Sequence, residues 1–306
     1  MSEAPTSQPF NHAVRGSGPE AAMSVTGLIA GFDQTPAATD LPLVIALHGG
    51  TYTSTYFDIP GYSLLSRAAA IGIPIIALDR PGYKGSTPVP ESESIILTNA
   101  DVLDEIIGEI WEDRGEGLRG VVLVAHSIGG AVATALAAKH PSWPLLGLAT
   151  SGCLLEVPGD SREAWASLPQ VPVIDLPSPM KDQVMFGPAG TYAEGMPAAS
   201  HPADAPVPRA ELIDITTTWI ARVQETASRV SVPVFHRQAE FDALWVTNAK
   251  QVERFAKAFT GAPTVDAKLQ PYSGHCIDFH RLSAAFHLEE LAFALRCAVG
   301  SEAPAG

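Results

Sequence analysis

The segment at residues 121–141, VVLVAHSIGGAVATALAAKHP, restricts the fold more than any other part of this chain. Its first four residues form an unbroken apolar run, which is typical of a strand buried on both faces. A run of small residues at helical spacing follows after a turn of only a few residues. A strand that passes so directly into a helix is typical of a parallel sheet covered by helices.

The same alternation of strand and helix continues along most of the 306 residues. Helix-length amphipathic segments separate most of the apolar runs. The sequence therefore predicts an α/β fold, with a mostly parallel central sheet flanked by helices. The apolar runs that predict strands lie at residues 43–47, 73–78, 121–124, 145–149, 232–235 and 265–269.

Two further strands are predicted near the N-terminus, at residues 12–15 and 23–30. Only a short turn-rich segment, residues 16–19, joins them, and so short a connection favours an antiparallel pair. Later in the chain, residues 98–111 repeat apolar side chains at the i, i+3, i+4 spacing of a helix. At its start, Thr98 and Asp101 resemble a capping box.

The regular alternation stops between residues 153 and 229, where ten prolines occur before one predicted helix at residues 211–229. A loop-rich segment of this length inside an α/β pattern is typical of an insertion with a function, often a lid. We therefore predict a core made of residues 1–152 and 230–306, with residues 153–229 inserted as a lid or cap.

Ser127 stands at the join between the strand and the helix of the opening segment. The residues around it, AHSIGG, come close to the G-x-S-x-G nucleophile elbow, with Ala125 in place of the first glycine. So tight a turn needs small neighbours, and it leaves the hydroxyl at a helix N-terminus, where backbone N–H groups favour negative charge. The alternative is an ordinary N-cap serine.

A serine hydroxyl needs a base, and the base needs an acid to orient it. The next suitable groups follow later strands: Glu240 and Asp242 after one, and His275 after the next. The chain order is therefore serine, acid, histidine, with each group just past the carboxyl end of a strand, where sites form in open α/β sheets. A histidine is more often structural than catalytic, and we expect this for the rival histidines His126, His236 and His280.

In this order of motifs the chain resembles the α/β-hydrolase superfamily, in particular its serine esterases, lipases and lactonases. The resemblance covers residues 41–140 and 230–293. It implies that Ser127 is the nucleophile, His275 the general base and acid, and Asp242 the carboxylate that orients the imidazole. Glu240 remains the competing acid.

The resemblance also implies an oxyanion hole. The residues LHGGTY after the first strong strand resemble the family's HG-x loop, which implies that the N–H groups of Gly50 and Ile128 hold the oxyanion. Thr51 is the neighbouring candidate if the register differs by one. The loop DRPGYKGS, at residues 79–86, resembles a family loop with an architectural role, with Lys84 in place of a usual glycine.

Charge and composition exclude several other functions. The formal net charge of −14 makes nucleic acid an unfavourable partner. No H-E-x-x-H, paired CxxC or P-loop motif occurs, so we expect neither a metal nor a cofactor.

The sequence begins without a basic, apolar leader and has no apolar run long enough to span a bilayer, so we expect a cytoplasmic protein. It leaves open whether the protein is a homodimer.

These observations predict a serine hydrolase that cleaves a carboxylic ester or lactone of a small, largely apolar substrate through an acyl-enzyme. Two alternatives stay open, because the same fold also serves non-hydrolytic lyases and small-molecule receptors. The aromatic residues expected to touch the substrate are Tyr52, Tyr56 and Phe57 after the oxyanion loop, and Trp165 and Trp219 in the insertion.

Overall fold

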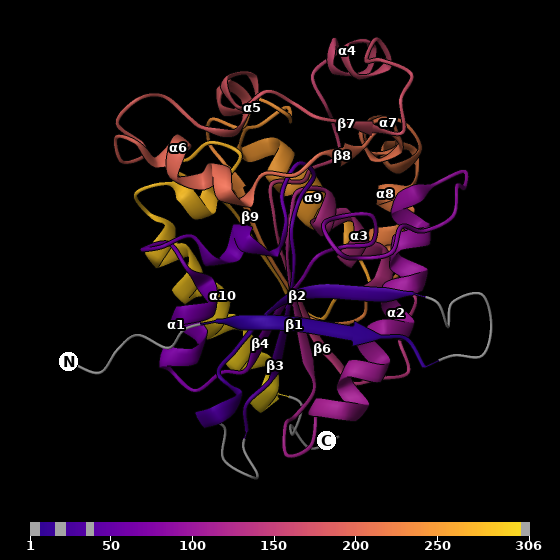
Figure 1. The fold of residues 1–306 in the computed structure, drawn as a ribbon, viewed down its shortest axis with the longest axis vertical. Coiled ribbons are helices and arrows are strands. Elements are labelled where there is room, and N and C mark those ends of the chain that lie inside the picture. Colours follow the sequence, from indigo (N-terminus) through magenta and orange to yellow (C-terminus); the bar gives the residue numbers. More distant parts are fainter. Residues whose placement is uncertain (1–6, 16–22, 35–39, 301–306) are drawn as a thin grey trace.

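The computed structural model describes residues 7–15, 23–34 and 40–300, and these contain a central sheet of eight strands (Figure 1). The strand order is β1-β2-β4-β3-β5-β6-β9-β10. The bounds of these strands are β1 Gln8–Ala13, β2 Ser24–Ala30, β3 Leu43–Leu47, β4 Ile75–Leu78, β5 Val121–His126, β6 Leu145–Ser151, β9 Val234–Ala239 and β10 Val265–Gln270.

The six strands from β4 to β10 pair in parallel, whereas β1 and β2 pair with each other and β2 with β4 in antiparallel register. The predicted mostly parallel sheet is therefore confirmed. The first strand begins four residues earlier than predicted, because Gln8 already pairs with Ile29. The turn predicted at residues 16–19 lies outside the described residues.

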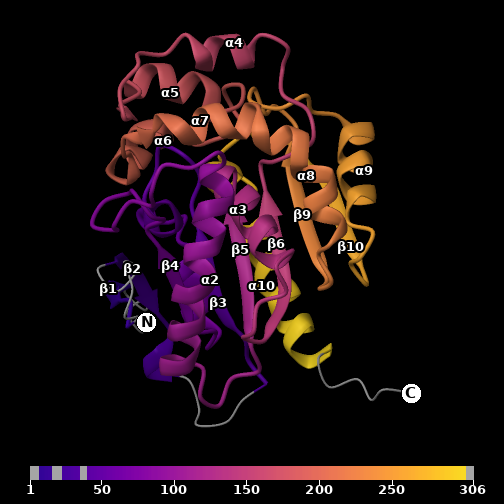
Figure 2. The same ribbon diagram turned by 90° about the vertical axis from the view of Figure 1, so that its right-hand side faces the viewer.

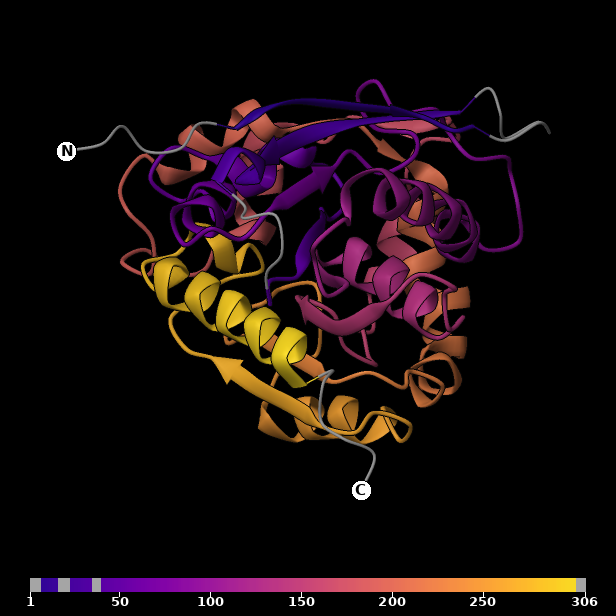
Figure 3. The same cartoon turned by 90° about the horizontal axis from the view of Figure 1, so that it is seen from below.

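Helices cover both faces of this sheet. Seen from below, α10 lies on the opposite side of the sheet from α2 and α3 (Figure 3). The α-helices are α1 Leu64–Ala70, α2 Ile95–Arg114, α3 Ile128–Ala137, α4 Ser161–Ala166, α5 Ser178–Met185, α6 Met196–Ser200, α7 Arg209–Thr216, α8 Thr218–Ser228, α9 Ala249–Ala258 and α10 Ser283–Gly300; the short 3-10 helices are η2 Phe32–Gln34, η3 Ser54–Asp58, η4 His201–Ala203 and η5 Ile277–Phe279.

The alternation of side chains along β3 explains why the sheet needs two covering layers. Leu43, Ile45 and Leu47 belong to the hydrophobic cluster that α2, α3, α8 and α9 complete. Val44 and Ala46 point into a second cluster, which α1 and α10 complete. All five residues are fully buried, so the unbroken apolar run serves both faces.

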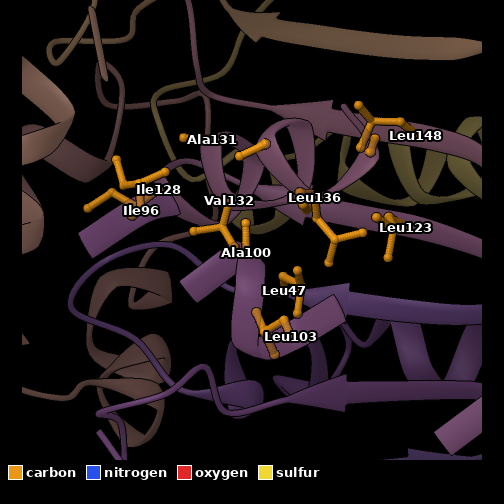
Figure 4. Close-up of a cluster of buried hydrophobic side chains, with 14 of the residues drawn as sticks. Leu47, Ile96, Ala100, Leu103, Leu123, Ile128, Ala131, Val132, Leu136 and Leu148 are labelled. Atoms are coloured by element: carbon orange, nitrogen blue, oxygen red, sulfur yellow. The ribbon is translucent and has the colours of Figure 1, made fainter. Parts of the chain in front are cut away.

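Helix α3 packs closely because its residues are small, and all ten of them are buried. Figure 4 shows Val132 and Leu136 of α3 in one cluster with Ala100 and Leu103 of α2. The helix predicted at residues 98–111 exists, but it begins at Ile95. The predicted capping box is therefore wrong, because the N-cap is Ser94, whose hydroxyl accepts a hydrogen bond from the Leu97 N–H.

The segment between β6 and β9 leaves the sheet completely, since these two strands are direct neighbours. It carries α4 to α8 and a small two-stranded sheet of β7 Val173–Ile174 and β8 Val207–Pro208. Figure 2 shows α4 to α7 stacked over the end of the main sheet to which β5 delivers Ser127. We refer to residues 153–229 as the inserted segment.

One long helix predicted at residues 211–229 is in fact two helices, α7 and α8, that meet at Thr217. Thr217 leaves helical geometry with φ −126° and ψ −86°. The hydroxyls of Thr216 and Thr217 donate to the carbonyls of Leu212 and Ile213, respectively. Such side-chain bonds to the preceding turn compete with backbone bonds, which explains the break.

Candidate active site

Ser127 occupies the sharp turn between β5 and α3. Its backbone adopts φ 55° and ψ −124°, a conformation that a residue other than glycine adopts only under strain. The turn requires small neighbours, because a Cβ on Gly129 would lie 2.4 Å from the carbonyl oxygens of both Leu47 and His48. Its hydroxyl makes no N-cap hydrogen bond, so the structure does not bear out the alternative of a simple helix cap.

The Ser127 hydroxyl lies in a continuous chain of hydrogen bonds with His275 and Asp242. Ser127 Oγ is 2.8 Å from His275 Nε2, and His275 Nδ1 is 2.8 Å from Asp242 Oδ2. Because an ionised carboxylate only accepts, Nδ1 carries the proton and Nε2 is free to accept the serine proton. The three candidate triad residues thus lie next to one another, and all three are buried.

The carboxylate of Asp242 is held from two further directions. Gln238 Nε2 donates to Oδ2 at 2.7 Å, and the Leu244 N–H donates to Oδ1 at 2.9 Å. The competing acid, Glu240, is exposed and accepts from the Tyr272 N–H instead. Sequence reasoning missed Gln238, although a polar side chain in the middle of an otherwise buried strand is itself a signal.

The rival histidines have structural partners. His280 Nε2 accepts from the Gly274 and Gly187 N–H groups, so it braces the loop that carries His275. His236 lies 2.9 Å from the Thr150 hydroxyl, between β6 and β9. Burial lowers the pKa of His280 to about 4 and that of His236 to about 3, with Arg237 adding to the second effect, so both rings are neutral at pH 7.

The third rival, His126, packs directly behind His275. Its ring lies 4.8 Å from that of His275 and stacks on Tyr56 at 4.8 Å with an interplanar angle of 10°. Nδ1 lies 3.0 Å from the Ser151 hydroxyl, and Nε2 has no hydrogen-bond partner in the described part of the chain. Burial, followed by the nearby His275, lowers its pKa to about 3, so His126 stays neutral.

The HGG loop lies directly against the nucleophile. A Cβ on Gly49 would stand 2.8 Å from the Ser127 Cβ, and one on Gly50 would stand 2.9 Å from the Ile128 Cδ1. Position 49 therefore requires glycine, whereas a side chain at position 50 would have to displace the end of the Ile128 side chain. Within the described residues, the amide N–H groups of Gly50 and Ile128 have no hydrogen-bond partner, and both residues line the same pocket as Ser127.

This pocket is apolar apart from three hydroxyls, and its volume is about 50 Å³. Among the described residues, no charged side chain lines it. Thr51, another lining residue, has a positive φ of 65°, and its buried hydroxyl has no partner in the described chain. The lining residues are Gly50, Thr51, Ser127, Ile128, Val157, Trp165, Leu176, Val184, Met185, Leu212, Ile215, Thr216, Leu244 and Trp245.

Of the five aromatic residues predicted to touch substrate, only Trp165 lines this pocket. Tyr52, Tyr56 and Phe57 are at most 2% exposed and pack in the second hydrophobic cluster, behind the nucleophile. Trp219 is buried in the first cluster, on α8. The chain turns into η3 shortly after the HGG loop, which carries the rings of Tyr56 and Phe57 into the core and away from the pocket.

Sequence reasoning missed most of the pocket wall. Trp245 and Leu244 follow Asp242 by two or three residues, so their closeness to the acid along the chain was an available signal. The other apolar lining residues come from the inserted segment, where no periodic pattern marks which side chains face the core.

A second polar cluster lies behind the His126–Tyr56 stack. Asp278 accepts from the Tyr56 hydroxyl at 2.7 Å and from His287 Nε2 at 2.8 Å. Glu290 completes a set whose side-chain atoms lie within 4.8 Å of one another, a spacing that could suit a metal ion. Burial and the nearby Asp278 raise the pKa of Glu290 well above its usual range, and both Asp278 oxygens already accept hydrogen bonds. Asp278, Tyr56 and His287 thus form a hydrogen-bonded network, and Glu290 lies beside it with Oε2 unpartnered in the described part of the chain.

The loop at residues 79–86 has the architectural contacts that the resemblance implied. Asp79 accepts from the Thr26 hydroxyl and from the Ser54 N–H, which ties β2 and η3 to the end of β4. Lys84 has a positive φ of 50°, so the backbone keeps the conformation that suits the glycine usual at this position.

Solved structures with a similar fold include enzymes of different chemistry. A soluble variant of monoglyceride lipase from Saccharomyces cerevisiae matches with a TM-score of 0.66 and 14% identity, over 97% of this chain and 96% of that one. An esterase from Thermogutta terrifontis matches with 0.62 and 17% identity, over 94% and 99%. A haloalkane dehalogenase loop variant from Bradyrhizobium elkanii matches with 0.62 and 17% identity, over 97% and 99%. At these identities the likeness shows the fold alone.

Relatives that match by sequence include the protein phosphatase methylesterases 1 of three mammals. Protein phosphatase methylesterase 1 from Mus musculus is 32% identical over 129 residues, which are 42% of this chain and 31% of the mouse protein. The matched part thus covers less than a third of that relative's length. Among the helices of the described residues, none has the length and apolar character needed to cross a membrane.

The match to a family model is broader than any of these pairwise matches. Residues 44–289 match the model of the alpha/beta hydrolase family, which includes the elbow, the acid turn, the histidine loop and the inserted segment. Together with the sheet order and the elbow geometry, this match places the chain in that family: it is an alpha/beta hydrolase.

Proposed function

We propose that this alpha/beta hydrolase cleaves a carboxylic ester or lactone through an acyl-enzyme on Ser127. The observation that carries the proposal is the chain of two 2.8 Å hydrogen bonds from Ser127 through His275 to Asp242. An aspartate nucleophile would stand at the elbow of a dehalogenase-type enzyme of this fold, so the serine favours acyl transfer.

The proposed reaction uses each group in turn. His275 Nε2 takes the Ser127 proton while Oγ forms a bond to the carbonyl carbon of the substrate. The N–H groups of Gly50 and Ile128 donate to the resulting oxyanion. The C–O bond to the leaving alcohol then breaks, and His275 returns the proton to that alcohol. Water, deprotonated by His275, releases the acid and restores Ser127.

The pocket supports a small, uncharged acyl group as the substrate's reactive end. Its volume is about 50 Å³. Pockets that hold drug-sized ligands are much larger, at about 300–1,000 Å³. A carboxylate or ammonium group in it would lose its hydration without a charged partner. Trp165, Leu212 and Ile215 reach this pocket from the inserted segment, which supports a role for residues 153–229 as a cap over the site.

The proposal is tested by steady-state kinetics on p-nitrophenyl esters from acetate to octanoate and on simple lactones. We expect wild-type turnover that is fastest with short acyl chains, and a fall in kcat of at least about 10⁴-fold in Ser127→Ala. Ser54→Ala is the matched control, because Ser54 is also buried and its hydroxyl has no partner in the described chain.

The same assay separates the alternatives. If Ser127→Ala retains wild-type turnover, the nucleophile assignment is wrong. If the wild type turns over no ester or lactone, hydrolysis itself is wrong, and cleavage of carbon–carbon bonds or binding without turnover becomes the function to measure in this fold.

A further inference from the structure

A fully buried ion pair joins the inserted segment to the HGG loop. Arg80, after β4, and Glu211, on α7, are both at most 1% exposed. Arg80 Nη1 and Nη2 donate to the two Glu211 oxygens at 2.6 and 2.9 Å. The Tyr83 hydroxyl donates to Glu211 Oε2 at 2.6 Å, so the carboxylate is fully engaged. Neither residue belongs to the triad, and the mechanism above makes no use of them.

The remaining donors of Arg80 bind the backbone of the HGG loop. Nε donates to the His48 carbonyl at 2.7 Å, and Nη2 also reaches the Gly49 carbonyl at 3.2 Å. His48 assists, since its Nε2 accepts from the Arg80 N–H, which leaves Nδ1–H to donate to the Gly49 carbonyl at 2.7 Å. The Gly49 carbonyl oxygen is therefore held by two donors on the side of Arg80.

This arrangement fixes the direction of an N–H group. In a trans peptide the C=O and the following N–H point in opposite directions. Because the Gly49 carbonyl points toward Arg80, the Gly50 N–H points away from it. Gly50 faces Ile128 and lines the pocket, and its N–H has no partner in the described chain. The donor expected at the oxyanion is thus aimed by the contacts of Arg80.

Glu211 links Arg80 to the inserted segment, because it lies on α7. On the same helix, α7, Leu212, Ile215 and Thr216 line the acyl pocket. Further along the HGG loop, the Ala205 N–H donates to the Thr51 carbonyl, and the Thr53 N–H donates to the Ala203 carbonyl, both at 2.9 Å. The residue that holds Arg80 and three residues that line the pocket therefore lie on one helix of the inserted segment.

We propose that Arg80, held by Glu211 of α7, is a positioning residue that aims the Gly50 N–H at the oxyanion, so that docking of the inserted segment completes the catalytic site. This inference rests on the proposed function. Arg80 donates four hydrogen bonds, to two carbonyls and to both oxygens of the carboxylate, and a lysine has only three N–H groups to donate.

The test removes both charges together, because Arg80→Met alone would leave Glu211 buried and unpaired. In Arg80→Met/Glu211→Met, an apolar pair of similar length replaces the ion pair, which proteins often tolerate without loss of stability. We expect a folded protein in which kcat for p-nitrophenyl acetate falls about 10²-fold while KM changes less than threefold. Arg80→Lys should fall between this variant and the wild type.

Inhibition distinguishes positioning from general damage. An alkyl trifluoromethyl ketone forms a tetrahedral oxyanion on the serine, whereas the matching methyl ketone only fills the pocket. In the double variant we expect the Ki of the trifluoromethyl ketone to rise by about the same factor by which kcat falls, and the Ki of the methyl ketone to stay unchanged. The control, Arg237→Met/Glu289→Met, removes another buried arginine, one with no contact to the HGG loop, and should leave both Ki values unchanged.

The outcomes separate the two proposals. If the double variant, or Arg80→Lys should the double variant not fold, keeps kcat and both Ki values within threefold of wild type, the positioning role is wrong while ester hydrolysis stands. If the wild type neither turns over esters nor binds the trifluoromethyl ketone more tightly than the methyl ketone, both proposals are wrong.

Discussion

The Ser127–His275 pair separates two regions of opposite character. On one side lies the pocket, whose wall among the described residues is apolar except for three hydroxyls. On the other side lie His126, Tyr56 and Asp278, a buried stack of polar groups that ends in His287. Hydrogen bonds and ring stacking link the groups of the rear region to one another, whereas the pocket wall offers mostly apolar side chains.

The two sides of the Ser127–His275 pair are therefore expected to have different roles, one in positioning the catalytic groups and one in selecting the substrate. Hydrogen bonds are directional, so Asp242 can hold the imidazole, and Arg80 and His48 can hold the HGG loop, each in one geometry. Apolar contacts are not directional, so the pocket selects by size and by the absence of charge. Changes on the polar side should therefore alter the rate, and changes on the apolar side should alter the choice of substrate.

The largest effect is expected on the polar side, at the acid. Asp242→Asn should lower kcat by about 10⁴-fold, because an asparagine no longer favours the His275 tautomer that accepts from Ser127. Glu240→Gln is the matched control and should change kcat less than threefold, since Glu240 is exposed and binds only the Tyr272 N–H. Steady-state kinetics on p-nitrophenyl acetate measure both. The reverse order of the two effects would make Glu240 the acid.

A smaller effect is expected on the apolar side, at Trp165. Trp165→Ala widens a pocket of about 50 Å³, so kcat/KM for the octanoate ester should rise about tenfold relative to that for the acetate. The kcat for acetate should stay within threefold of wild type. Trp111→Ala, on α2 and outside the pocket, should leave the chain-length preference unchanged. An unchanged preference in Trp165→Ala would show that this side chain does not limit the acyl group.

The smallest effect is expected at His126, behind His275, and it concerns how the free energy of unfolding depends on pH. His126 is neutral when folded because its pKa is about 3, whereas an unfolded histidine binds a proton below about pH 6.5. The unfolded state therefore holds the extra proton between about pH 6.5 and 3, and stability is lost as the pH falls through that window. His126→Phe, which keeps a ring beside Tyr56, should reduce this loss by about 1.4 kcal/mol per pH unit.

Urea unfolding at pH 8, 6 and 5 measures this difference. The free energies of unfolding of wild type and His126→Phe should run parallel above pH 7, and below it that of the wild type should fall more steeply. Parallel lines down to pH 5 would mean that His126 gains its proton in the folded protein and that the rear region is more open to charge than the structure indicates.

The sequence was sufficient for the parts of the molecule that have a period or a strict local geometry. Unbroken apolar runs predicted the parallel strands because a strand buried on both faces has little other choice of residues. The elbow at Ser127 was predictable because so tight a turn admits only small neighbours. The order of Ser127, Asp242 and His275 then followed from where each lies along successive strands.

Other features depend on contacts between distant segments and leave no local pattern. The pocket wall comes largely from the inserted segment, and the Arg80–Glu211 pair joins residues 131 positions apart. Tyr52, Tyr56 and Phe57 follow the HGG loop in sequence, yet all three pack in the core, the last two on η3. The predicted helix at residues 211–229 failed at Thr217, where side-chain hydroxyls compete with the backbone.

The central claim is that Ser127 forms the covalent intermediate. Wild-type protein and Ser127→Ala are treated with a fluorophosphonate probe, digested and analysed by peptide mass spectrometry, with Ser54→Ala as the control. Our account predicts one adduct per wild-type chain on the peptide that contains Ser127, the same adduct in Ser54→Ala, and none in Ser127→Ala. Equal labelling of wild type and Ser127→Ala, or an adduct on a different residue of the wild type, would contradict it.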